Sequence, residues 1–127
     1  MVKDNGVHMA YIKFLAAWKN QDICDLKKML SQDIEVRISY SDKQIVLDYP
    51  RTVKLLEKRF EIQQDWHFDI IQQYTREDEN IIVTNITRED SNARLLEPLF
   101  LSIFTFKGDS NNSQLIRLHI EAELNPI

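Results

Sequence analysis

The last part of the chain, residues 97–124, constrains the fold most strongly, because it contains two strand-like segments separated by one polar turn. The first segment, 97–106, holds the longest apolar run of the sequence, and the second, 115–124, alternates apolar with charged residues. A period of two is typical of a β-strand that buries one face. Residues 108–112 read Gly-Asp-Ser-Asn-Asn, which is typical of a turn. We therefore expect a strand pair that the rest of the chain covers.

Four segments upstream also predict strands. Residues 34–40 alternate strictly between apolar and polar side chains, and 44–47 is a short strand that pairs back against them. Residues 66–74 place aromatic and aliphatic side chains on one face, and 81–87 is rich in β-branched residues, which favour a pleated surface. Polar connections separate the last four strands, so we expect them to form an antiparallel meander.

Three segments predict helices, because their apolar residues recur three or four positions apart. The first covers about 6–19 and the second about 23–30. In the turn between them, Asn20 can adopt the left-handed conformation and Asp22 can cap the second helix. The third covers about 49–64, after an aspartate cap and with a proline in its first turn.

The order of these elements predicts an α+β fold with three helices on one face of an antiparallel sheet. The 127 residues fit one domain, 1–127, which is large enough to bury a core without a disulfide or a structural metal.

The composition argues against several partners and cofactors. A net charge of -4 repels phosphate backbones, and we interpret the basic clusters at 27–28 and 51–59 as solvated helix faces, so we expect no nucleic-acid partner. No apolar run approaches the ~20 residues that span a bilayer, so we expect no membrane association. The chain has 2 glycines, which is too few for a glycine-rich phosphate loop, and we expect no cofactor.

Cys24 is the single cysteine, which excludes an intramolecular disulfide and a cysteine-based zinc site. A lone cysteine, together with an N-terminus that lacks an apolar signal core, favours a cytoplasmic location. His67 and Asp69 alternate on one polar face and could join His119 in a metal site. Nothing in the sequence brings these residues together, so we predict no metal.

Two stretches, together with the element order, resemble a known family. Residues 11–22 read Tyr-Ile-Lys-Phe-Leu-Ala-Ala-Trp-Lys-Asn-Gln-Asp, and residues 30–36 read Leu-Ser-Gln-Asp-Ile-Glu-Val. The chain resembles the nuclear-transport-factor-2-like (NTF2-like) superfamily, and it is most similar to small bacterial SnoaL-like and ketosteroid-isomerase-like members. This resemblance implies a curved sheet wrapped around the helices as a cone, which is a cystatin-like α+β roll. It also implies that the cone often holds a ligand and that the outer sheet face often forms a dimer.

The resemblance does not choose a function, because members include isomerases, dehydratases, cyclases and epoxide hydrolases as well as modules without catalytic activity. Ketosteroid isomerase requires an aspartate base and an oxyanion hole of a tyrosine and a protonated aspartate. The resemblance places Phe14 at the tyrosine position and Ile38 at the base position, and neither carries a protic group. We therefore do not expect steroid-isomerase chemistry. The alternative is that the alignment shifts by one residue, in which case Tyr11 or Tyr40 would supply the missing protic group.

His119 is the main catalytic candidate, with Glu121 and Tyr40 as further candidates. Alternation places Arg117 and Glu121 on the same strand face as His119. A nearby carboxylate can orient an imidazole and raise its pKa, which suits a general acid or base. The same alternation is also typical of the polar outer face of an antiparallel sheet without any chemistry.

The large aromatic residues suggest an apolar ligand pocket, because such pockets are lined by aromatic side chains with a few polar groups. Tyr11 and Tyr40 are the polar groups expected to point into it. Ordinary core packing is the alternative interpretation of the same residues. The predicted pocket residues are Tyr11, Phe14, Trp18, Tyr40, Phe60, Trp66, Phe68 and Phe104.

The strand at 97–106 predicts a homodimer. Leu99, Leu101 and Ile103 occupy one of its faces and phenylalanines occupy the other, and the helices can cover only one of them. An apolar face left in water usually marks an interface, and a twofold pair of sheets is the simplest solution. The predicted interface residues are Leu99, Leu101, Ile103, Leu115, Arg117 and His119.

Two functions follow from these interpretations. The first is a non-catalytic module that dimerises through its outer sheet face and binds a small apolar ligand. The second is a SnoaL-like lyase, isomerase or hydrolase that acts on a small apolar or polyketide-like substrate. The position of His119 discriminates between them, because a catalytic histidine would line a closed cavity beside another ionisable group.

Overall fold

The computed structural model describes residues 5–96, 99–108 and 112–125, with side chains from residue 11 onward. The elements within these ranges confirm the predicted α+β order. Residues 97–98, predicted to begin the strand of 97–106, and residues 109–111 of the predicted turn lie outside the described residues. The elements are α1 (Asn5–Lys19), α2 (Ile23–Met29), β1 (Leu30–Ser39), β2 (Gln44–Leu47), α3 (Tyr49–Arg59), β3 (Asp65–Arg76), β4 (Glu79–Glu89), β5 (Leu99–Lys107) and β6 (Gln114–Leu124).

The strands form one sheet with the order β2-β1-β6-β5-β4-β3. β3 to β6 make the predicted antiparallel meander, and β1 and β2 are also antiparallel. β1 and β6 are parallel, which differs from the uniformly antiparallel sheet that was expected. No hairpin fixes the relative direction of this pair, because α3 and three strands of the meander separate them in the chain.

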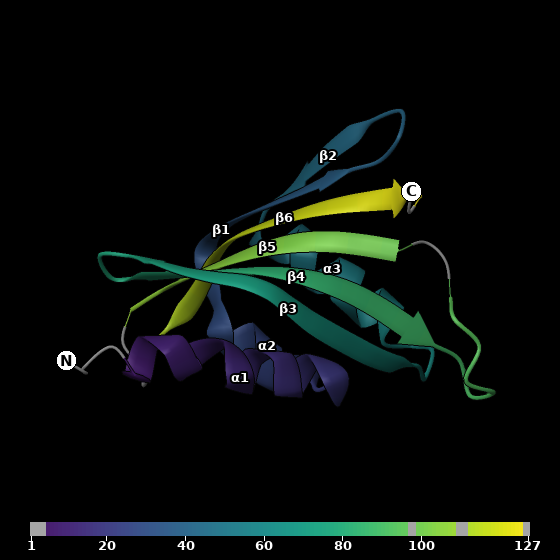
Figure 1. Ribbon diagram of the computed structural model, residues 1–127, viewed down its shortest axis with the longest axis horizontal. Coiled ribbons are helices and arrows are strands. Elements are labelled where there is room, and N and C mark those ends of the chain that lie inside the picture. The colour runs from purple at the N-terminus through teal and green to yellow at the C-terminus, as the bar shows by residue number, and fades with distance from the viewer. Residues whose placement is uncertain (1–4, 97–98, 109–111, 126–127) are drawn as a thin grey trace.

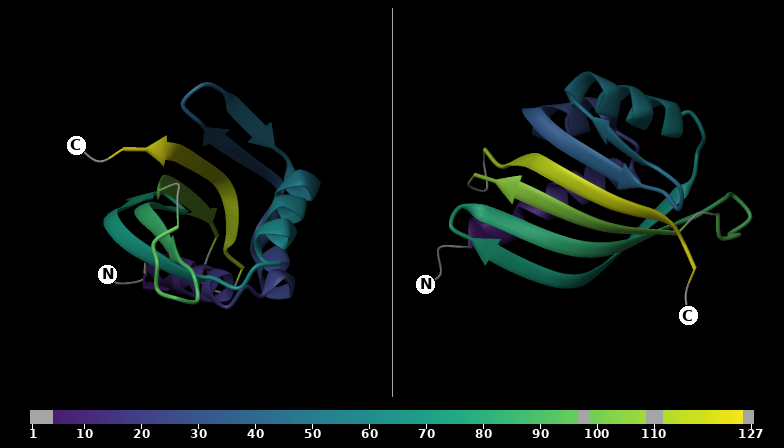
Figure 2. Two further views of the ribbon diagram at one scale, coloured as in Figure 1. Left: turned by 90° about the vertical axis from the view of Figure 1, so that its right-hand side faces the viewer. Right: turned by 90° about the horizontal axis from the view of Figure 1, so that it is seen from above.

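The three helices lie on one side of the sheet, as Figure 1 shows. The two views of Figure 2 show the strands curving around that side, with the β1–β2 hairpin beside α3. We call the side that faces the helices the inner face and the opposite side the outer face. No helix in the described part of the chain is long and apolar enough to cross a bilayer.

The turn between α1 and α2 ties both helices to the rest of the fold. Asp22 caps α2 as predicted, because its side chain accepts a hydrogen bond from the Asp25 amide at 3.1 Å. The left-handed residue is Gln21, with φ at 54°, and not Asn20 as predicted. The Gln21 side chain accepts a bond from Trp66 Nε1 at 3.0 Å and donates one to the Phe60 carbonyl at 3.3 Å. These bonds link the turn to β3 and to the end of α3.

Helix α3 is capped by Asp48, which accepts a hydrogen bond from the Arg51 amide at 3.1 Å. It ends at Arg59, five residues before the predicted boundary of 64. Gln64, predicted to be helical, instead donates from its side chain to the carbonyls of Arg59 at 2.9 Å and Ile62 at 3.1 Å. These bonds close the connection that leads into β3.

The core fills the space between the helices and the inner face. Phe14 of α1 is fully buried, and its ring centroid lies 5.4 Å from that of Phe106 and 6.0 Å from that of Phe104. Burial of one such side chain stabilises a fold by about 1.5–3 kcal/mol. The Phe14 ring therefore packs in the core, and it has no protic group that could take part in catalysis.

Candidate functional site

Alternation along β5 separates two surfaces with different chemistry. Phe100, Ser102 and Phe104 turn toward the helices, and Ser102 and Phe104 are fully buried. Ile103 lies between them on the outer face and is 39 % exposed. Leu101 lies on the same outer face and is half-buried. A site on the inner face is therefore built from different residues of β5 than a site on the outer face.

A cavity opens on the inner face, between α3 and the strands β1 and β6. Its outer part, which we call the mouth, has a volume of ≈ 60 Å³. A deeper part has a volume of ≈ 30 Å³, and the two parts share five lining residues. The mouth is lined by Trp18, Ile38, Tyr40, Leu55, Leu56, Arg59, Trp66, Ile86, Phe100 and Ile120. The deeper part is lined by Phe14, Trp18, Leu30, Val36, Ile38, Thr52, Leu55, Leu56, Leu115, Leu118 and Ile120.

Half of the predicted pocket residues line this cavity. Trp18, Tyr40 and Trp66 line the mouth, and Phe14 and Trp18 line the deeper part. The other four pack beside it and do not line it, which corrects the prediction for Tyr11, Phe60, Phe68 and Phe104.

The aromatic cluster around Trp18 explains this correction. Its ring meets Phe60, Phe68 and Phe104 edge-on at centroid distances of 6.4, 5.8 and 6.2 Å. Edge-to-face contacts of this length are close packing and leave no space for a ligand. These aromatic residues therefore form a wall behind Trp18.

Most residues that line the cavity were missed by the sequence interpretation, and three of them follow one face of α3. Thr52, Leu55 and Arg59 line it from α3, and they are spaced three and four residues apart. This spacing places them on one helical face, and it was the signal available in the sequence. The helix was predicted from the spacing of its apolar residues, which does not single out Thr52 or Arg59.

Two polar atoms in this region have no hydrogen-bond partner within the described residues. They are Trp18 Nε1 and Thr52 Oγ1, and both belong to side chains that line the deeper part. Trp18 is 5 % exposed and Thr52 is 4 % exposed. A buried polar atom without a partner costs about 1–3 kcal/mol, so these two groups need a partner such as a ligand or an ordered water.

The catalytic candidates His119 and Glu121 lie on the outer face. His119 Nε2 is 3.0 Å from Glu121 Oε2 and 3.5 Å from Ser39 Oγ. The structure thus brings this pair together as alternation indicated, and 42 % of the His119 side chain is exposed. Tyr40, the third candidate, lines the cavity on the inner side of the sheet. The three candidates therefore do not form one site.

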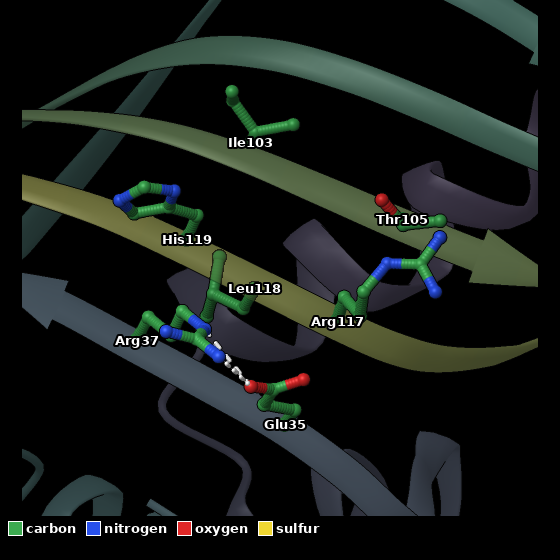
Figure 3. A pocket seen from close by; sticks show the side chains of 7 residues that line it. All are labelled: Glu35, Arg37, Ile103, Thr105, Arg117, Leu118 and His119. Atoms are coloured by element: carbon green, nitrogen blue, oxygen red, sulfur yellow. Dashed lines mark hydrogen bonds and ion pairs between the residues drawn. The ribbon is translucent and has the colours of Figure 1, made fainter. Parts of the chain in front are cut away.

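His119 contributes to a shallow groove of ≈ 280 Å³ across β1, β5 and β6. Figure 3 shows Ile103 at one border of this groove, with His119 and Arg117 on the neighbouring strand and the Glu35–Arg37 pair beyond them. Arg37 and Glu35 form an ion pair at 2.6 Å along its edge. The groove is lined by Glu35, Arg37, Ile103, Thr105, Arg117, Leu118 and His119.

Ion pairs organise one end of the outer face around Glu79. Its Oε1 accepts from Arg76 Nη2 at 2.8 Å and from Arg117 Nη2 at 3.3 Å. The hydrogen bond from Arg76, assisted by the charge of Arg117, holds the pKa of the Glu79 carboxyl below its usual range. The predicted interface residue Arg117 is thus already paired within its own chain.

His67 lies elsewhere on the same face, where its Nε2 is 3.6 Å from Glu89 Oε1. The cross-strand partner of His119 on β5 is Ile103. In the part of the chain that the structure describes, no three histidine, cysteine or acidic residues are grouped to hold a metal ion.

Large apolar side chains remain exposed on the outer face. Tyr74 is 54 % exposed and pairs across the strands with Ile81, and Val46 is 48 % exposed and pairs with Arg37. Leu99 and Leu124 line a second groove of ≈ 600 Å³ at the ends of β5 and β6. Of the predicted interface residues, Leu99, Leu101, Ile103, Arg117 and His119 lie on or border this face.

Leu115 is the exception among the predicted interface residues. It is fully buried and lines the deeper cavity. Thr105 pairs with Arg117, whereas the next residue, Phe106, pairs with Leu115, so Ile116 is an extra residue in β6. This bulge reverses the alternation and turns Leu115 inward.

Comparisons with known proteins identify the fold. No protein-family model matches the chain, and no curated protein matches its sequence. A ketosteroid isomerase-like protein from Erwinia carotovora atroseptica SCRI1043 matches with a TM-score of 0.69 and 14 % identity, over 99 % of this chain and 100 % of that one. A candidate dehydratase of the NTF2-like family from Streptomyces avermitilis matches with a TM-score of 0.73 and 10 % identity, over 94 % of this chain and 95 % of that one.

A candidate SnoaL-like polyketide cyclase from Shewanella putrefaciens CN-32 matches with a TM-score of 0.64 and 13 % identity, over 89 % of this chain and 77 % of that one. The chain therefore has the NTF2-like fold, in agreement with the resemblance inferred from its sequence. At these identities the similarity identifies the fold, and function has to be argued from the two faces of the sheet.

Proposed function

We propose that this chain is a cytoplasmic, non-catalytic module that dimerises through its outer sheet face and holds a small apolar ligand in its inner cavity. One observation carries the proposal: the inner cavity is lined almost entirely by apolar and aromatic side chains, while the His119–Glu121 pair lies on the other side of the sheet. The cavity and the His119–Glu121 pair are thus separated by the thickness of the sheet. The exposed thiol of Cys24 fits a reducing compartment.

The case for a ligand rests on the cavity itself. Apolar pockets with a few polar groups are the usual form of small-molecule sites. Here the polar groups are Tyr40 and Arg59 at the mouth and Thr52 in the deeper part. The unpartnered atoms Trp18 Nε1 and Thr52 Oγ1 add a reason for this space to be occupied.

The case for a dimer rests on the outer face. Ile103 is exposed in the middle of this face, and Val46 and Tyr74 are exposed on its two edge strands, β2 and β3. Exposed apolar side chains on one face are typical of an interface. The same face carries both carboxylates and guanidinium groups, among them Glu35 and Arg37. A twofold axis brings a surface against its own copy, so a face with both signs of charge can be complementary to itself.

A SnoaL-like lyase, isomerase or hydrolase is the second candidate function, and the Tyr40 side chain at the mouth favours it. General acid–base chemistry also requires a second group within hydrogen-bond reach of the substrate. Neither a carboxylate nor an imidazole lines the cavity among the described residues, and Arg59 is its one charged lining residue. The arrangement therefore supports binding better than catalysis.

The proposal is tested by intrinsic fluorescence and light scattering. Trp18 and Trp66 are the 2 tryptophans of the chain, and both line the mouth, so a neutral apolar probe such as 1-hexanol should change the emission spectrum. Leu55→Phe should fill the space and abolish this change, whereas the matched change Leu95→Phe, outside the cavity, should leave it intact. Light scattering should give twice the chain mass of 15.1 kDa. An unchanged spectrum with a strictly monomeric mass would reject the proposal.

A further inference from the structure

We infer that the ligand of the inner cavity is a small amphipathic acid, with its carboxylate at Arg59 and Tyr40 and its apolar body between α3 and the sheet. This inference rests on the proposed ligand-binding function and adds the chemical class of the ligand. It follows from the charge at the mouth, from a comparison of Arg59 with three arginines of the outer face and from the size of the cavity.

The first argument is the charge at the mouth. Arg59 is the one charged residue among the ten that line it, and the other nine are aromatic or aliphatic. A guanidinium presents donors in a planar fork that matches the two oxygens of a carboxylate. The Tyr40 hydroxyl belongs to the same lining and supplies a further donor. The mouth is therefore complementary to an anionic head group on an apolar body.

The second argument is that Arg59 is left without a carboxylate partner. Within residues 5–96, 99–108 and 112–125, no ion pair or side-chain hydrogen bond engages its guanidinium. By contrast, Arg37 pairs with Glu35, and both Arg76 and Arg117 pair with Glu79. These three arginines have their charge balanced on the outer face, whereas the charge of Arg59 remains available at the cavity.

The position of Arg59 at the end of α3 does not by itself account for this placement. A basic residue in the last turn complements the helix dipole wherever its side chain points. Lys58 stands in the same turn and provides such a charge without lining the cavity. Arg59 differs because it occupies the helical face of Thr52 and Leu55, which both line the cavity.

Two further positive charges lie near the mouth without lining it. The Arg88 guanidinium carbon lies 5.8 Å from the centroid of the Trp66 ring and 5.3 Å from that of the Phe100 ring, and Arg88 donates a hydrogen bond to Gln64 Oε1 at 3.3 Å. Lys43 Nζ lies 5.3 Å from the centroid of the Tyr40 ring. The Glu123 carboxylate lies close to it and accepts bonds from Ser41 N at 3.0 Å and Ser41 Oγ at 2.8 Å. Arg59 differs from Lys43 and Arg88 because its own side chain is part of the lining, so it is the cation that a ligand at the mouth would contact directly.

The third argument concerns the body of the ligand. The mouth and the deeper part, at ≈ 60 and ≈ 30 Å³, are together smaller than the ~150 Å³ engineered cavity that holds benzene. The cavity is open at the mouth, so we expect a short alkyl chain to lie partly within this space and partly outside it. A polar atom on that chain could partner Trp18 Nε1 or Thr52 Oγ1, which are otherwise unpartnered. The ligand class is thus a short-chain carboxylic acid, with or without an oxygen substituent.

The experiment compares hexanoate with hexanamide, which has the same chain and a neutral head group. Binding is read from the emission of Trp18 and Trp66, with isothermal titration as a second measurement. The native protein should bind hexanoate at least about tenfold more tightly than hexanamide, and added salt should reduce this preference. Arg59→Gln should remove the preference by weakening hexanoate alone, and Arg59→Lys should retain part of it. Lys58→Gln removes the same charge one residue away and should leave the preference unchanged.

The outcomes separate this inference from the proposed function. Equal affinity for hexanoate and hexanamide would overturn the acid assignment while leaving the cavity as a binding site. A preference for hexanoate that survives in Arg59→Gln would overturn the role of Arg59, and hence the inference. If neither compound binds and 1-hexanol also leaves the spectrum unchanged, the proposed ligand-binding function itself fails. Because Arg59 is exposed, melting curves of its variants should match the native curve, which excludes misfolding as the cause.

Discussion

The inner and outer faces of this sheet are built from the same strands, yet they handle polar groups in opposite ways. On the outer face the arginines are paired: Glu79 accepts bonds from both Arg76 and Arg117. On the inner face the unpaired groups are buried, as Trp18 Nε1 and Thr52 Oγ1 illustrate. Large apolar side chains such as Ile103 are exposed on the outer face. The outer face thus has its arginines paired and part of its apolar surface uncovered, whereas the inner face has its apolar surface covered and some polar atoms unsatisfied.

This difference tells us what each face lacks. An outer face with paired charges and exposed apolar groups needs apolar cover, which a second copy can provide. An inner face with apolar cover and unpaired polar groups needs a small polar or amphipathic occupant. The fold places these two requirements back to back, so each can be tested by changes that leave the other face intact.

The largest effect is expected from Phe104→Ala on the inner face. Phe104 is fully buried against Phe14 and Trp18, so its loss removes apolar contacts and leaves a cavity. The free energy of unfolding should fall by about 3–5 kcal/mol in urea denaturation. The adjacent change Ile103→Ala, on the outer face, should cost the monomer far less. Similar losses for both variants would contradict the assignment of the faces.

The second effect is the loss of the dimer in Ile103→Lys. Ile103 is 39 % exposed and lies between His119 and Val83 on the outer face. A lysine there would bury a charge in a twofold interface, which is costly unless the charge is paired. Light scattering should show a shift from dimer to monomer, with the far-UV circular dichroism unchanged. Ile12→Lys, at an exposed position on α1, is the matched control and should remain dimeric.

The sequence predicted the two faces correctly wherever β5 and β6 keep a strict period of two. Phe104 and Ile103 were placed on opposite faces by alternation alone. Leu115 was misplaced because Ile116 is an extra residue in β6 and reverses the alternation beyond it. A bulge depends on the pairing of neighbouring strands, so a single strand pattern does not reveal it.

The cavity was less predictable than the fold. The aromatic residues predicted to line it divide into lining residues such as Trp66 and packing residues such as Phe68. Composition does not distinguish these roles, because free volume depends on how α3 docks against β1 and β6. For the same reason Arg59 was interpreted as part of a solvated helix face, although it lines the mouth of the cavity.

A smaller effect, with the opposite sign, is expected for Thr52→Val on the inner face. The side chain is 4 % exposed and its hydroxyl has no partner within the described residues, so valine of similar shape removes an unsatisfied group. The free energy of unfolding should rise by about 1 kcal/mol in urea denaturation without ligand. Thr87→Val, on the outer side of β4, should not give this gain. Destabilisation by Thr52→Val would mean that the hydroxyl is already satisfied, for example by an ordered water.

The smallest effect tests whether the paired charges of the outer face stabilise the monomer. Because Arg76, assisted by Arg117, lowers the pKa of Glu79, the folded protein binds this proton less readily than the unfolded chain does. The resulting stabilisation is complete above the ordinary pKa of 4.5 and is lost as the pH falls through the lower folded value. Glu79→Gln should therefore cost less than about 1 kcal/mol at neutral pH, and this difference should vanish in acid.

The control for this last change is Glu57→Gln on α3, because Glu57 is exposed and no ion pair engages it within the described residues. Its difference from the native protein should stay near zero at every pH. A difference for Glu79→Gln that persists in acid would mean that the carboxylate contributes through packing rather than charge. Loss of the dimer in Glu79→Gln would instead mean that its ion pairs extend to the second copy. The cluster of Glu79, Arg76 and Arg117 would then belong to the dimer interface, and the charges of the outer face would be paired between two copies as well as within one.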